Sequence, residues 1–160
     1  MKSLVVYYSR SGNTKRIGDE VAAALGADVE ELKDRTNRQG VTGWMKSGSD
    51  ARRKRIADLE PAVHDPAEYD LVVLGGPVWA FTICSPTRTY ALTHRDSFKR
   101  VAFLSTGGDY KSIEKAFDAL REATGMEPVG TLALTEGDVK DDYAEPLAEF
   151  LSSLDSQHKR

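Results

Sequence analysis

The stretch YYSRSGNTKRI, residues 7–17, joins a run of apolar residues to a segment with helical periodicity. Residues 4–8 form an unbroken apolar run, which is typical of a strand covered on both faces. Ile17, Val21 and Leu25 then recur every four residues, as on the buried face of a helix, and a glycine follows the last of them. The stretch therefore predicts a buried strand, a polar turn and a helix.

The same alternation continues along the chain. Apolar patterns predict strands at 27–32, 70–75, 100–105 and 129–134, and helices at 113–125 and 143–154. Strands that alternate with helices over short links are typical of a parallel sheet with helices on both faces. At 160 residues the chain is expected to form a single α/β domain, residues 1–160. Ligands of such sheets bind beyond the carboxyl ends of the strands, so the loops at that edge are expected to form any ligand site.

Residues 33–61 interrupt this pattern, because they are long, polar and contain three glycines. The segment also contains Trp44 and the basic run RRKR at 52–55. A loop of this length inside a compact domain is usually functional or contains its own helix, so we expect a helix within 42–56. The basic run is expected to lie either on a solvated helix face or at a ligand pocket.

The composition argues against several classes of protein. A net charge of −3 is too small to indicate a nucleic-acid partner. Cys84 is the single cysteine, which excludes an intramolecular disulfide and a multi-cysteine zinc site. No segment approaches the ~20 apolar residues of a membrane span, and the apolar start is too short for a signal peptide. We therefore expect a cytoplasmic protein with no nucleic-acid partner, no membrane insertion and no metal site.

The polar turn after the first strand has the composition of an anion site. It reads Ser9-Arg10-Ser11-Gly12-Asn13-Thr14. A helix N-terminus offers unpaired N–H groups and the positive end of a dipole, so it binds phosphate without a lysine. Taken alone, the turn fits a plain helix cap by Ser11 or Asn13 equally well. Its spacing excludes a Walker loop and a Gly-x-Gly-x-x-Gly dinucleotide turn.

A second loop is expected after the strand at 70–75, in the sequence GGPVWAFTICSP, residues 75–86. The two glycines are expected to turn the chain sharply, and the proline to fix the backbone where the strand ends. Trp79 and Phe81 would then lie in a loop, where a planar ligand stacked on them would account for two large aromatic side chains. The alternative is a hydrophobic latch onto a neighbouring helix.

A third loop, STGGDYKS, is expected at 105–112. The small residues at 106–108 expose backbone groups, and Tyr110 again places an aromatic side chain in the loop. Asp109 or Ser112 would also cap the next helix, and the two roles are compatible. One loop with phosphate donors and two with small and aromatic residues indicate a site for a phosphorylated, planar, aromatic ligand.

These motifs resemble the flavodoxin family. Its phosphate loop reads Ser/Thr-x-Ser/Thr-Gly-x-Thr, which residues 9–14 match at every fixed position, and YDLVVLGGPVWAFTICSP at 69–86 is similar to its second flavin loop with Pro-x-Trp. The resemblance implies a three-layer αβα fold, with a five-stranded parallel sheet of order 2-1-3-4-5 and non-covalently bound FMN. It implies a phosphate site at Ser9, Arg10, Ser11, Gly12, Asn13 and Thr14. It implies flavin contacts from Pro77, Val78, Trp79, Ala80 and Phe81 on one side, and from Thr106, Gly107, Gly108, Asp109 and Tyr110 on the other.

The chain departs from many flavodoxins in two respects. Those proteins are strongly acidic, whereas this chain has a net charge of −3 and a basic run at 52–55. The segment 33–61 is longer than in the simplest flavodoxins, and it resembles an extended segment with glycine and tryptophan in one flavodoxin-like subfamily. Both departures weaken the transfer of the family's low-potential carrier role to this chain.

We expect a redox protein that transfers electrons through FMN between partner proteins or small donors and acceptors, as a monomer or a dimer. The flavin would supply the chemistry, so no catalytic side chain is expected. The alternative is an NAD(P)H-dependent quinone or flavin reductase, in which 33–61 builds a second pocket over the flavin. An interaction domain without FMN is disfavoured because the phosphate loop is intact.

Overall fold

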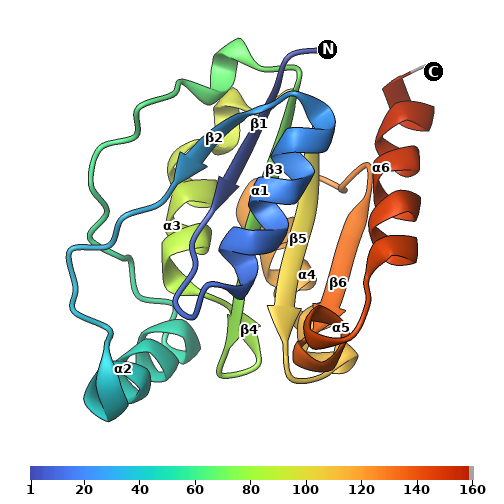
Figure 1. Cartoon of the computed structure of the whole chain (residues 1–160). Coiled ribbons are helices and arrows are strands. Elements are labelled where there is room, and N and C mark those ends of the chain that lie inside the picture. The colour runs from blue at the N-terminus through green and yellow to red at the C-terminus, as the bar shows by residue number, and fades with distance from the viewer. Residues whose placement is uncertain (159–160) are drawn as a thin grey trace.

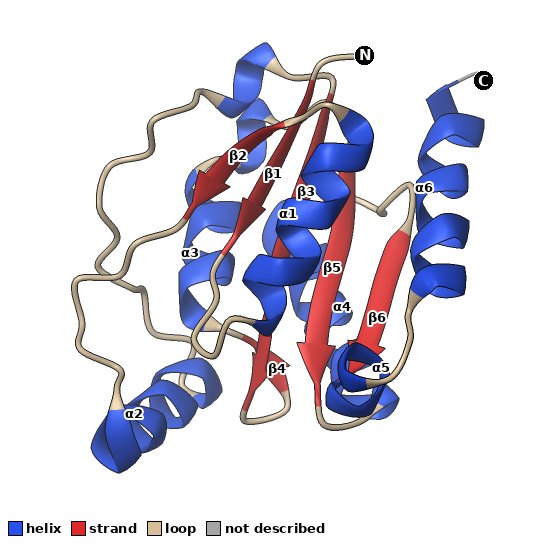
Figure 2. Cartoon of the chain, in the orientation of Figure 1, coloured by secondary structure: helices blue, strands red, loops and turns tan. Residues whose placement is uncertain are grey.

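A parallel β-sheet in the order β2-β1-β3-β5-β6 forms the centre of the molecule (Figures 1 and 2). The structure is a computed structural model, which describes residues 1–158. The strands are β1 (Ser3–Tyr7), β2 (Asp28–Glu31), β3 (Leu71–Trp79), β4 (Thr82–Ile83), β5 (Val101–Gly107) and β6 (Thr131–Thr135). β4 pairs antiparallel with the end of β3 and lies off the main path. The five parallel strands therefore have the predicted order 2-1-3-4-5.

Helices cover both faces of the sheet (Figure 2). One core packs the sheet against α1 (Asn13–Leu25) and α6 (Ala144–His158), and the other packs it against α3 (Ser85–Thr93) and α4 (Tyr110–Thr124). The shorter elements are α2 (Gly40–Arg52), α5 (Glu136–Lys140) and the 3-10 turns η1 (Pro66–Glu68) and η2 (Arg95–Ser97). The predicted three-layer αβα fold is confirmed. Within residues 1–158, no helix combines the length and the apolar character that crossing a membrane requires.

β3 is longer than predicted, and the chain does not turn at its two glycines. It continues as a strand to Trp79, and the turn comes at Ala80 and Phe81, which have φ angles of 49° and 66°. A Cβ atom at Gly76 would lie 2.6 Å from Sγ of Cys84 and 2.5 Å from the hydroxyl oxygen of Thr87. Gly76 therefore allows the start of α3 to pack against the strand, which is a different use of glycine from the predicted turn.

The segment 33–61 contains the expected helix, α2, which starts two residues before the predicted window. Figure 1 shows α2 beyond the carboxyl ends of the strands, beside the β3–β4 hairpin. A single β-bridge between Asp34 and Leu59 joins the two ends of the segment. The segment thus leaves the sheet and returns to it, and it carries α2 to the edge where ligands of such folds bind.

Candidate functional site

The three predicted loops meet at one edge of the sheet. β3 lies between β1 and β5, with Tyr7 paired to Gly75 and Pro77 paired to Thr106. The loops that follow these three parallel strands are therefore neighbours in space (Figure 1). Residues 9–14 follow β1, residues 80–81 form the tip of the β3–β4 hairpin, and residues 108–109 lead into α4.

The polar turn after β1 leaves the start of α1 open. The N-cap residue of α1 is Gly12, with φ 101° and ψ −14°, and within the described part of the chain this helix start has no side-chain cap hydrogen bond. Neither Ser11 nor Asn13 caps it, so the plain-cap interpretation is wrong. The hydroxyl of Ser9 accepts a hydrogen bond from the Gly12 N–H at 3.1 Å, which fixes the turn. The first N–H groups of α1 are therefore available to an anion from outside the chain.

Two side chains of this turn serve the structure around it. Thr14 is buried, and its hydroxyl lies 3.0 Å from the hydroxyl of Thr106, which joins the turn to β5. Arg10 donates hydrogen bonds to the backbone carbonyls of Arg38 and Gly40, at 3.0 and 3.1 Å. The start of α2 is thereby tied to the predicted phosphate loop.

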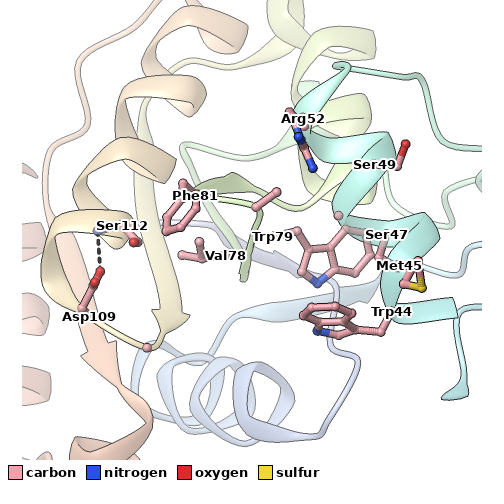
Figure 3. Close-up of a pocket in the computed structure, with 13 residues that line it drawn as sticks. Trp44, Met45, Ser47, Ser49, Arg52, Val78, Trp79, Phe81, Asp109 and Ser112 are labelled. Atoms are coloured by element: carbon pink, nitrogen blue, oxygen red, sulfur yellow. Dashed lines mark hydrogen bonds between the residues drawn. The ribbon is translucent and has the colours of Figure 1, made fainter. Parts of the chain in front are cut away.

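A cavity of about 690 Å³ opens between α2, the hairpin and the start of α4 (Figure 3). Six of the residues predicted to contact the flavin line it: Val78, Trp79, Ala80, Phe81, Gly108 and Asp109. Seven further lining residues are Trp44, Met45, Ser47, Gly48, Ser49, Arg52 and Ser112. Its volume falls within the range of small-molecule sites, roughly 300–1,000 Å³.

The remaining predicted flavin contacts lie outside this lining. They are Pro77, Thr106, Gly107 and Tyr110. Tyr110 is about half exposed, and its hydroxyl donates a hydrogen bond to the Asp138 carboxylate in α5. This bond raises the pKa of Tyr110 and lowers that of Asp138. The structure therefore gives Tyr110 a partner on the side of α5.

The two aromatic residues of the hairpin have different environments. Trp79 is only 8% exposed, because Tyr8 packs against it edge-on at 5.4 Å and the guanidinium of Arg38 lies 4.9 Å from the centre of its ring. The expectation that Trp79 lies in a loop is wrong, since it is the last residue of β3 and is buried. Phe81 is 68% exposed at the hairpin tip. Trp79 thus forms a fixed wall of the cavity, and Phe81 lies at its rim.

A buried ion cluster holds α2 against this wall. The side chain of Arg38 is almost fully buried and donates to the carboxylates of Asp34 and Asp50 and to the hydroxyl of Ser47. Burial alone would raise the pKa of Asp50, but the hydrogen bond and charge of Arg38 and the nearby cations lower it below its ordinary value. Gly43 is needed here, because a Cβ atom would lie 2.2 Å from the Arg38 carbonyl carbon.

Asp109 caps α4, as one interpretation of the third loop predicted, and it also lines the cavity. Its carboxylate accepts a hydrogen bond from the Ser112 N–H at 2.7 Å as the N-cap of α4. The same hydrogen bonds to Ser112 lower the pKa of Asp109. Its carboxylate is therefore ionised at neutral pH and already engaged with the protein.

Two other kinds of chemistry find no support in the described part of the chain. Among the side chains that the structure describes, those of residues 1–155, no group of three or more from His, Cys, Asp or Glu is placed to hold a metal ion. Cys84 is completely buried, and burial raises the pKa of its thiol to about 11. The thiol therefore stays protonated at neutral pH and does not act as a nucleophile.

Comparisons with known proteins agree with this geometry. A sequence model of the family described as flavodoxin matches residues 2–142. No curated protein matches the sequence of the chain. Solved structures with the same fold include a flavoprotein in complex with FMN from Lactobacillus acidophilus, 20% identical, with a TM-score of 0.66 over 87% of this chain and 96% of that chain. Another is oxidised flavodoxin 2 from Bacillus cereus, 18% identical, with a TM-score of 0.58 over 98% and 99% of the two chains.

Proposed function

We propose that this chain, which belongs to the flavodoxin family, binds FMN non-covalently and transfers electrons through it. The observation that carries the proposal is the uncapped start of α1 behind Gly12, beside a cavity with aromatic walls. The similar flavoprotein from Lactobacillus acidophilus in complex with FMN supports the choice of cofactor. FMN would supply reversible transfer of one or two electrons, and the chain would bind and orient it.

The phosphate of FMN would occupy the turn at 9–14. The backbone N–H groups at the start of α1 would donate to it, and the hydroxyl of Ser11, which is exposed, would add a further donor. Arg10 and Thr14 would act mainly by fixing the turn, because their side chains already bind neighbouring groups. A site built from backbone donors suits the single phosphate of FMN, for which no Walker lysine is needed.

The flavin ring would enter the cavity between the hairpin and the start of α4. Trp79 would offer it a rigid aromatic surface, and base–aromatic stacking is worth roughly 1–3 kcal/mol per ring. Residues 108–109 would approach it with their backbone from the other side. α2 would cover the site and limit the access of water to it.

FMN binding gives the first test. We expect the purified protein to be yellow, to release FMN on denaturation and to take up added FMN when it has been stripped of flavin. Absorbance of the released flavin and fluorescence titration of the stripped protein measure both properties. A colourless protein that takes up no added FMN would contradict the proposal.

An NAD(P)H-dependent reductase is the second candidate function. It is favoured by one observation, which is that α2 adds a second wall with Trp44, Met45 and Arg52 to the predicted flavin site. Steady-state oxidation of NADH or NADPH, with a quinone or ferricyanide as acceptor, distinguishes the two functions. A carrier is expected to show no turnover until a reductase is added, whereas turnover by the isolated protein would favour the enzyme.

A further inference from the structure

Arg52 is a cation at the cavity without a partner among the side chains that the structure describes. Three other cations around α2 are paired, because Arg38, Lys46 and Arg55 all contact the carboxylate of Asp50. Arg53, at the C-cap of α2, does not line the cavity. Among residues 1–155, whose side chains the structure describes, the guanidinium of Arg52 finds no hydrogen-bond or ion-pair partner, although the residue lines the cavity. A charged group that faces a cavity and has no partner is available to an anionic ligand.

Arg52 lies at the far end of α2 from the predicted phosphate site. The start of α2 is held there by the hydrogen bond from Arg10 to the carbonyl of Gly40. Twelve residues separate Gly40 from Arg52, which corresponds to ~18 Å along a helix axis. Arg52 is therefore too remote to neutralise a phosphate bound at the start of α1.

The first half of α2 offers an apolar surface to the same cavity. Trp44 and Met45 line the cavity but remain 65% and 62% exposed. Trp44 and Arg52 are eight residues apart, ~12 Å along the axis, on overlapping faces of the helix. Figure 3 shows the two side chains at opposite ends of the cavity-lining stretch of α2. An aromatic ring and an anionic group on one molecule match this arrangement.

We propose that α2 binds a second ligand beside the flavin, a planar aromatic molecule that carries a carboxylate or sulfonate group. Trp44 and Met45 would contact the ring system, and Arg52 would bind the anionic group. The Asp109 carboxylate belongs to the wall formed by the start of α4, where the Ser112 N–H and the positive end of the helix dipole offset part of its charge. A quinone with an acidic substituent has this chemistry. The proposal rests on the proposed function in one respect, which is that FMN fills the inner part of the cavity against Trp79.

A pair of matched probes tests the proposal. Anthraquinone-2-sulfonate carries the anionic group, and 2-(hydroxymethyl)anthraquinone has the same ring system without it. Calorimetric titration of the FMN-loaded protein is expected to show tighter binding of the sulfonate. Arg52→Gln is expected to lower the affinity for the sulfonate by about tenfold, because one charge-assisted hydrogen-bonded pair is lost. The affinity for the neutral probe is expected to stay unchanged. Arg53→Gln is the matched control, because Arg53 is exposed but does not line the cavity.

Three results would overturn the proposal. They are an Arg52→Gln variant that binds the sulfonate as the parent does, an equal loss in Arg53→Gln, and release of FMN by the probe. The affinity of each variant for FMN is measured first, so that a failure of the proposed function is seen separately. If the chain takes up no FMN, the same titrations on the flavin-free chain decide the α2 site. If the flavin-free chain binds the sulfonate and Arg52→Gln weakens that binding, the α2 site is supported. If it does not bind the sulfonate, or the variant binds it equally well, the proposal is overturned.

Discussion

Replacing Arg38 by methionine is expected to release α2 from the hairpin. Methionine keeps much of the apolar contact with Trp79 but leaves the buried carboxylates of Asp34 and Asp50 without their main cation. Removing one partner of a buried ion pair typically costs about 3–5 kcal/mol. α2 lies outside the hydrogen-bonded sheet, so the loss is expected first as local opening. Hydrogen exchange should show protection of the α2 amides reduced by about 100-fold or more, the equivalent of ~3 kcal/mol.

Arg35→Met is the control for this variant. Arg35 pairs with Asp58 at 3.1 Å, but both side chains are more than half exposed, and such pairs contribute at most about 1 kcal/mol. Equal protection of α2 in the two variants would show that the buried cluster does not hold the helix.

The effect of Arg38→Met should also depend on pH. The pKa of Asp50 is lowered in the folded protein, so its pairing stabilises the fold above the ordinary pKa of an aspartate, near 4. That contribution to stability is lost as the pH falls through the lowered pKa of Asp50. The variant lacks the pair between Arg38 and Asp50, so its stability falls less over this pH range than that of the parent protein. Stability measured by urea unfolding is therefore expected to differ more between parent and variant at pH 7 than at about pH 2, well below the ordinary pKa of an aspartate.

The central strands of the sheet were predictable because they are buried on both faces, whereas their order was implied by the resemblance to the flavodoxin family. Such strands appear in the sequence as continuous apolar runs, and β1, β3 and β5 are of this kind. α3 was not predicted, because SPTRTYALT has no apolar stripe and buries small and hydroxyl-bearing residues instead. Thr87 shows the reason: it is fully buried, and its hydroxyl donates to the Gly75 carbonyl at 2.8 Å. Close packing on a glycine strand replaces the usual apolar pattern there.

The candidate site was predictable only in part, because the wall formed by the β3–β4 hairpin has a clear sequence pattern and the wall formed by α2 does not. The hairpin wall follows a strand, so its position at the ligand-binding edge could be inferred from chain order. The α2 wall comes from a long polar segment, whose path depends on the pairing of Arg38 with Asp34 and Asp50. Charged residues of this kind read as surface residues in a sequence, and only the structure shows that they are buried. Trp44 and the basic run at 52–55 did indicate a possible pocket, and Trp44 and Arg52 indeed line the cavity.

Replacing Gly12 by aspartate is expected to weaken FMN binding by about 100-fold. The proposed phosphate site is the start of α1, and a carboxylate at its N-cap would place a negative charge where the phosphate is expected to lie. Two charges about 4 Å apart near a protein surface interact by roughly 4 kcal/mol, part of which is screened by salt. Apart from the two neighbouring residues of the chain, no described atom lies within 4 Å of a Cβ built at Gly12, so there is room for the start of a side chain.

The backbone at Gly12 requires a control for strain, because its φ of 101° disfavours L-residues. Gly12→Asn has the same shape as the aspartate variant without its charge, and Gly26→Asp introduces the charge at a second left-handed glycine, at the other end of α1. We expect Gly12→Asn to lose less than about tenfold in FMN affinity, since asparagine and aspartate tolerate this conformation similarly, and Gly26→Asp to lose none. Raising the salt concentration should narrow the gap between Gly12→Asp and Gly12→Asn, because screening weakens only the charge. If the two Gly12 variants bind FMN equally at low salt, the phosphate does not bind at this turn, and the assignment of residues 9–14 is wrong.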